Sequence, residues 1–162
     1  MRKSIMVSVF VGVCMLSQAF SADFRNDAAL EGLKTVKVVF DVNTGNSSLL
    51  AGRLDLILIT YDQLKEFGQK PEFVVAFRGP ATRFMTKGDF HVQPDQLSDK
   101  NRIQESIKKF KELGFSLEQC AIAAQAFGVE VLDFLPEITL VANGYISLIG
   151  YQNKGYAFLP ME

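Results

Sequence analysis

Cys120 is the residue of this sequence best suited to covalent chemistry. It lies in FSLEQCAIAAQAFGVEV (115–131), between a strand-like run and a helix-like run. A thiolate is a nucleophile, and a nearby cation or helix N-terminus makes it easier to form. The other cysteine, Cys14, falls in a stretch that resembles a cleavable leader, so after cleavage no intramolecular disulfide could form. Cys120 is therefore either a reactive thiol or a buried structural cysteine, since free cysteines are commonly buried.

Other polar residues share one feature with Cys120: each lies at or just after the end of a predicted strand. In parallel α/β sheets, ligands bind in the crevice outside the carboxyl ends of the strands. We therefore expect a ligand-binding crevice beside Cys120 that includes Asn43, Arg78, Gly79 and Asn143. The alternative for the two asparagines is plain turn chemistry, because asparagine commonly ends strands.

Side-chain alternation along the predicted strand at 115–121 bears on whether Cys120 is reactive. Successive side chains of a strand point to opposite faces of the sheet. Cys120 falls on the same face as Ser116 and Glu118, which favours a reactive thiol over a buried one. Arg78, at a neighbouring strand end, is the cation expected to steady a charged sulfur, and we expect backbone N–H groups to assist it.

The elements that must position these residues alternate between short β-branched runs and amphipathic helical periods. This order predicts an α/β fold with a mostly parallel sheet covered by helices on both faces. The predicted strands cover residues 36–42, 72–77, 115–121, 138–142 and 156–160. The predicted helices cover residues 48–68, 99–114, 121–127, 129–135 and 145–155, with helical turns at 81–88 and a loop at 89–99.

Composition and missing motifs exclude several function classes. The 162 residues are 48% hydrophobic with a net charge of −1, which is typical of a globular domain and makes nucleic acid an unlikely partner. One histidine and one cysteine outside the leader are too few for a usual zinc or iron site, so we expect neither metal nor cofactor. No G-x-S-x-G elbow, Walker loop or G-x-G-x-x-G turn is present. Whether the chain is an enzyme stays open.

The N-terminal stretch MRKSIMVSVFVGVCMLSQAFSADF has the pattern of a signal peptide. Arg2 and Lys3 form a basic start, residues 5–16 form an apolar run too short to span a bilayer comfortably, and small residues follow. We expect cleavage after about residue 19–22, a single domain over 23–162, no membrane span in the mature chain, and a periplasmic or secreted location. The alternative is a retained anchoring or core helix.

The predicted helix at 48–68 carries more apolar surface than one sheet contact needs. At 100° per residue, one face holds the positions expected to pack on the sheet, namely Leu50, Leu54, Ile57, Tyr61 and Leu64. Leu56 and Ile59 project instead toward the side that carries acidic residues. We therefore predict a homo-oligomer in which this helix contributes to the subunit contact.

Several segments together resemble the DsrE/DsrF-like family, of the sulfur-relay, TusD-like type. They are KVVFDVNTGN, VVAFRGPATRFM, CAIAAQAFGV and DFLPEITLVANGYISLIGYQNKGYAFLP, which span about residues 34–160. In the third segment a cysteine, Cys120, is followed eight residues later by Gly128 and an aliphatic residue. The resemblance implies a three-layer α/β/α sandwich with a five-stranded, largely parallel sheet, and a homo-oligomer, commonly a trimer or hexamer.

In relay members of this family the matched cysteine carries sulfur as a persulfide. The resemblance thus implies that Cys120 accepts sulfane sulfur from a donor protein and passes it to an acceptor protein. The alternative is a non-catalytic oligomeric module that binds a small ligand or a protein, with a structural Cys120. A thiol–disulfide enzyme is a weaker third possibility, because no C-x-x-C motif exists.

Overall fold

The computed structural model describes residues 24–162. The chain divides into two units, Met1–Glu31 and Gly32–Glu162. In the first unit only residues 24–31 are described, and they hold the short helix α1 (Asp27–Leu30). The predicted signal peptide lies outside the described residues. The second unit holds the sheet and every residue predicted for the site.

The second unit is built on a five-stranded, all-parallel sheet with the order β4-β3-β2-β1-β5. This confirms the predicted fold class, and the strand bounds agree with the sequence pattern to within two residues at each end. The central strands are apolar and rich in valine and phenylalanine, as strands buried on both faces are. The strands are β1 (Thr35–Val42), β2 (Lys70–Phe77), β3 (Ser116–Cys120), β4 (Thr139–Val141) and β5 (Ala157–Met161).

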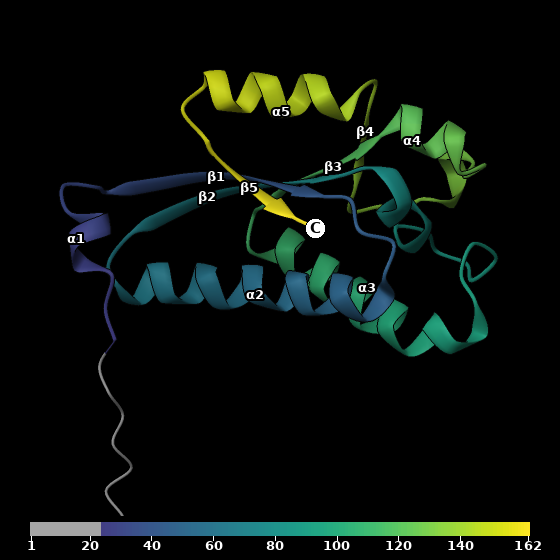
Figure 1. Ribbon diagram of the computed structural model, residues 1–162, viewed down its shortest axis with the longest axis horizontal. Helices are drawn as coiled ribbons and strands as arrows, with labels where there is room; N and C mark the ends of the chain where they lie inside the picture. Colours follow the sequence, from purple (N-terminus) through teal and green to yellow (C-terminus); the bar gives the residue numbers. More distant parts are fainter. Residues whose placement is uncertain (1–23) are drawn as a thin grey trace, which may run out of the picture. The chain divides into compact units, whose positions relative to one another are not determined.

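Helices cover both faces of this sheet, which gives three layers (Figure 1). One face is covered by α2 (Ser47–Glu66) and α3 (Leu97–Glu112), and the other by α5 (Gly144–Asn153) with the shorter α4 (Ala121–Ala126) near it. Three 3₁₀ helices complete the unit, η1 (Gly79–Phe84), η2 (Pro94–Gln96) and η3 (Val131–Asp133). Among the described residues, no helix combines the length and the apolar character needed to cross a membrane.

The prediction of a helix at 129–135 is wrong, because only the single turn η3 forms there. Gly128 adopts φ 63°, a left-handed conformation that ends α4 and turns the chain away. The predicted loop at 89–99 is also too long, since η2 and the first turn of α3 occupy its second half.

The face of α2 that packs on the sheet is the predicted one. Leu50, Leu54 and Ile57 are fully buried, whereas Leu56 and Ile59 are about half exposed, at 47% and 49%. The α2 side of the sheet also holds an aromatic cluster, in which the Phe115 ring lies 5.2 Å from Phe73. Across the sheet, Val39, Val74 and Ala76 pack with Leu148 of α5.

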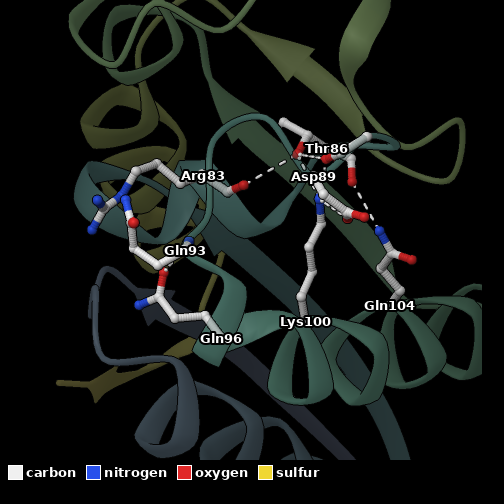
Figure 2. Close-up of polar contacts among 8 residues, drawn as sticks. Arg83, Thr86, Asp89, Gln93, Gln96, Lys100 and Gln104 are labelled. Carbon is white, nitrogen blue, oxygen red and sulfur yellow. Dashed lines mark hydrogen bonds and ion pairs between the residues drawn. The ribbon is translucent and has the colours of Figure 1, made fainter.

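Lys100 of α3 has a fully buried side chain, which is unusual for a lysine. Figure 2 shows its ammonium group beneath the segment that follows η1. Nζ donates to Thr86 Oγ1 at 3.2 Å and to the Gly88 carbonyl, and it pairs with Asp89 Oδ1 at 3.2 Å. Gln104, one turn further along α3, donates to the Thr86 carbonyl at 2.9 Å. Together these bonds fasten residues 86–89 to α3.

Candidate functional site

A cavity of about 210 Å³ opens at the carboxyl ends of β2 and β3. Cys120, Arg78, Gly79 and Asn143 all line it, although they come from three separate strand ends. The structure thus brings four of the predicted residues together at one cavity, whereas Asn43 is not among the residues that line it. The rest of the wall comes from α4 and its end and from the start of α5, and consists of Ile122, Ala123, Ala126, Phe127 and Tyr145.

Cys120 is the last residue of β3 and the residue directly before α4. Its side chain makes no capping hydrogen bond to that helix. It lies on the same sheet face as Glu118, as the alternation predicted, but only 6% of it is exposed. The expectation that the Cys120 side chain is not buried, which rested on its polar neighbours in the strand, is therefore wrong. The thiol is a buried group at the wall of a cavity rather than an open surface group.

Gly144 explains why Cys120 is covered. A Cβ atom at this position would lie 3.1 Å from the Cβ and 3.6 Å from the Sγ of Cys120, and 3.7 Å from the Cβ of Arg78. The absence of a side chain therefore lets the first turn of α5 rest directly on the thiol. The sequence pattern gave no sign of this contact between Gly144 and Cys120.

Arg78 forms a two-bond ion pair with Asp41 that sequence reasoning missed. Nε and Nη2 of Arg78 donate to the two carboxylate oxygens of Asp41, both at 2.6 Å. The Asp41 side chain is 4% exposed and that of Arg78 is 19% exposed. These hydrogen bonds raise the pKa of the Arg78 guanidinium above its usual value, although burial opposes the shift. Asp41, near the end of β1, therefore binds and orients Arg78.

Tyr145 engages the remaining part of the guanidinium. Nη1 of Arg78 lies 3.3 Å from the Tyr145 hydroxyl, and the guanidinium carbon lies 4.8 Å from the centre of the Tyr145 ring. The guanidinium is therefore fixed on both sides and its charge is paired. Arg78 is therefore not a free cation that could steady a charged sulfur at Cys120 on its own.

Gln119 holds the end of β3 in place from the opposite face of the sheet. Its side-chain amide donates to the Cys120 carbonyl at 3.0 Å and to Thr82 Oγ1 at 2.9 Å. Both Gln119 and Thr82 are fully buried. The strand end that carries the thiol is thereby tied to η1, which follows Arg78.

The two predicted asparagines have different places. Asn143 lines the cavity and also caps α5, since its Oδ1 accepts a hydrogen bond from the Tyr145 N–H at 2.9 Å. Asn43 borders Gly79, where an added Cβ atom would lie 3.6 Å from the Asn43 carbonyl oxygen. Gly79 itself adopts φ 53°, which a side chain would strain. Asn43 thus lies beside the turn at Gly79 and is not among the residues that line the cavity.

A second cavity, of about 360 Å³, lies near the start of β3 and is lined in part by Glu118 and Tyr151. The Tyr151 hydroxyl donates to Glu118 Oε1 at 2.7 Å. Burial, together with this hydrogen bond, raises the pKa of Tyr151 to about 12. This hydroxyl therefore stays protonated at neutral pH. Within residues 24–162, no three histidine, cysteine, aspartate or glutamate side chains are placed to hold a metal ion.

The family profile that matches this chain covers residues 37–161 and is described as the DsrE/DsrF-like family. The chain belongs to the DsrE/DsrF-like family. The resemblance noted in the sequence is thereby confirmed, and the match includes the four residues that line the cavity at the strand ends.

This DsrE/DsrF-like chain is similar to an uncharacterized protein of Aquifex aeolicus (strain VF5). The two are 32% identical over 127 residues, which are 77% of this chain but only 56% of that protein. This chain thus spans just over half the length of the curated relative it matches.

Two solved structures share the fold. One is a protein of unknown function, MTH1491, from Methanobacterium thermoautotrophicum, with a TM-score of 0.59 and 15% identity. The other is the ychN protein from E. coli, with a TM-score of 0.57 and 14% identity. Each alignment covers 77% of this chain and 98% of the other.

Proposed function

We propose that this chain is an exported sulfur carrier of the DsrE/DsrF-like type. In this proposal Cys120 accepts a sulfane sulfur as a persulfide and passes it to an acceptor. The observation that carries the proposal is the position of Cys120. It is the free cysteine among the described residues, and it lines a cavity at the carboxyl ends of the strands.

The chemistry needs a thiolate and a path to it. Loading takes place when the Cys120 thiolate attacks the outer sulfur of a donor, and unloading takes place when an acceptor thiolate attacks the outer sulfur of the Cys120 persulfide. Neither step needs a metal or a general acid–base pair. Cys120 directly precedes α4, whose first N–H groups have no partner within the helix and can help to steady a charged sulfur.

Three further parts of the proposal rest on the sequence. The signal-peptide pattern at residues 1–22 supports export to the periplasm or beyond. The half-exposed Leu56 and Ile59 on α2 support a homo-oligomer, a trimer or hexamer by analogy with the family. A carrier also needs a donor protein and an acceptor protein, which the surface around the cavity would have to receive.

Intact-mass spectrometry tests the proposal. The mature chain is treated with inorganic polysulfide or with ethyl hydropersulfide, and then compared with Cys120→Ser treated in the same way. We expect the mass of added sulfur on the wild type alone, and its loss when a thiol acceptor is added. No added sulfur on the wild type, or equal labelling of Cys120→Ser, would refute the carrier function.

A second function is favoured by one observation, the 6% exposure of Cys120. In a non-catalytic module this cysteine would be structural, and the cavity would bind a small ligand or part of a protein partner. Thiol accessibility separates the two functions. A carrier should react in its folded state with small thiol reagents such as iodoacetamide, whereas reaction only after denaturation would support the binding module.

A further inference from the structure

We propose that the cavity beside Cys120 selects sulfane-sulfur donors that can enter it in an uncharged form, such as small alkyl hydropersulfides in their protonated form R–S–S–H, over donors such as thiosulfate that stay anionic. This inference rests on the proposed function, because it names the class of donor for the same thiol. It follows from the charge, the wall and the size of the cavity.

The one cation in the cavity wall is neutralised. Of the described residues that line the cavity, Arg78 is the only one with a basic or acidic side chain other than Cys120 and Tyr145. Both carboxylate oxygens of Asp41 accept hydrogen bonds from it at 2.6 Å, and Glu162 adds a further negative field at Arg78. A dianion that enters the cavity therefore meets an ion pair rather than a net positive charge.

Arg83 does not supply the missing charge. Its guanidinium lies 5.8 Å from the centre of the Phe127 ring, and Arg83 is not among the residues that line the cavity. Anion sites in proteins commonly present unpaired cations or convergent N–H groups to their ligand. The basic side chains near this cavity are instead directed to a carboxylate and to aromatic rings.

Apart from Asn143 and Tyr145, the remaining side chains of the wall are apolar. Ile122, Ala123, Ala126 and Phe127 present alkyl groups and an aromatic ring. An anion that loses its hydration against such a wall is destabilised, whereas an uncharged alkyl group is stabilised there. The cavity of about 210 Å³ is also smaller than the roughly 300–1,000 Å³ of typical ligand pockets, which favours a small donor.

The sulfur transfer balances without an oxidant or reductant. The Cys120 thiolate attacks the outer sulfur of the donor R–S–S–H, and a new S–S bond forms at Cys120. The S–S bond of the donor breaks, and its electron pair leaves with R–S⁻, which takes a proton from solvent. The products are Cys120–S–S–H and the thiol R–SH, so the number of sulfane sulfurs is unchanged.

The experiment compares loading of the wild-type mature chain by ethyl hydropersulfide and by thiosulfate. Intact mass is followed over time, and N-acetylcysteinamide serves as the reference thiol that corrects for the intrinsic reactivity of each donor. The preference is the loading rate with ethyl hydropersulfide divided by the loading rate with thiosulfate. We expect this ratio to be at least about tenfold higher for Cys120 than for the reference thiol. An equal or lower preference would overturn this inference while leaving the carrier function intact. If neither donor loads Cys120, both are refuted.

A charge placed at the cavity rim gives a second readout. Ile122 lines the cavity and is 55% exposed, whereas Ile146 is 65% exposed and is not part of the wall. Ile122→Lys should raise thiosulfate loading several-fold relative to ethyl hydropersulfide, because an unpaired positive charge at the rim attracts the dianion. The matched control Ile146→Lys should leave the ratio unchanged. Equal ratios in both variants and the wild type would contradict the electrostatic basis of the selectivity.

Discussion

Removing Arg78 should destabilise the protein more than removing its partner Asp41. In Arg78→Met the Asp41 carboxylate loses both of its 2.6 Å bonds, and its side chain is only 4% exposed. Leaving one member of a buried ion pair without its partner costs about 3–5 kcal/mol. In Asp41→Asn the guanidinium is 19% exposed and keeps one acceptor, so we expect a smaller loss of about 1.5–3 kcal/mol.

The double variant Arg78→Met/Asp41→Asn separates the ion pair from the packing around it. No buried charge remains in this variant, so it should be more stable than Arg78→Met alone, with a coupling energy of about 1–3 kcal/mol. Urea unfolding followed by circular dichroism at pH 7 gives the free energies of unfolding for all four proteins. Strictly additive losses, or a double variant less stable than Arg78→Met, would refute the reasoning.

Three further predictions concern Gly144, Lys100 and α2. Gly144→Ala places a Cβ atom 3.1 Å from the Cβ of Cys120. Labelling of Cys120 by iodoacetamide should therefore slow, and the free energy of unfolding should fall by about 1 kcal/mol. Unchanged labelling would argue against this contact. Lys100→Met should lower the free energy of unfolding by about 1–3 kcal/mol in urea, because the Gly88 carbonyl loses its donor, whereas exposed Lys108→Met should have almost no effect. Ile59→Asp should reduce the oligomer to smaller species in light scattering, and a monomeric wild type at micromolar concentration would contradict the assembly.

Most of the scaffold could be predicted because its signals are local. Strands such as 36–42 and 72–77 are short apolar runs bounded by turn residues, and α2 and α3 have clear helical periods. The parallel order then brings the strand ends together, so Cys120, Arg78 and Asn143 line one cavity, whereas Asn43 does not.

The interior of the site could not be predicted because it depends on contacts between distant segments. Asp41 and Arg78 are 37 positions apart, and only the β1–β2 register brings their side chains together. The cover over Cys120 likewise depends on where α5 begins. The burial of Lys100 depends on carbonyl and hydroxyl groups of residues 86–89, which no helical period of α3 reveals.

The most direct test of the central claim is the state of Cys120 in protein isolated from its own compartment. The sample is alkylated at once with iodoacetamide, digested, and the peptide that contains Cys120 is analysed by mass spectrometry. The carrier function predicts a fraction of this peptide with an extra sulfur between Cys120 and the alkyl group, which is lost on reduction. A peptide found only as the alkylated thiol, in wild-type cells grown with a sulfane-sulfur source, would contradict it.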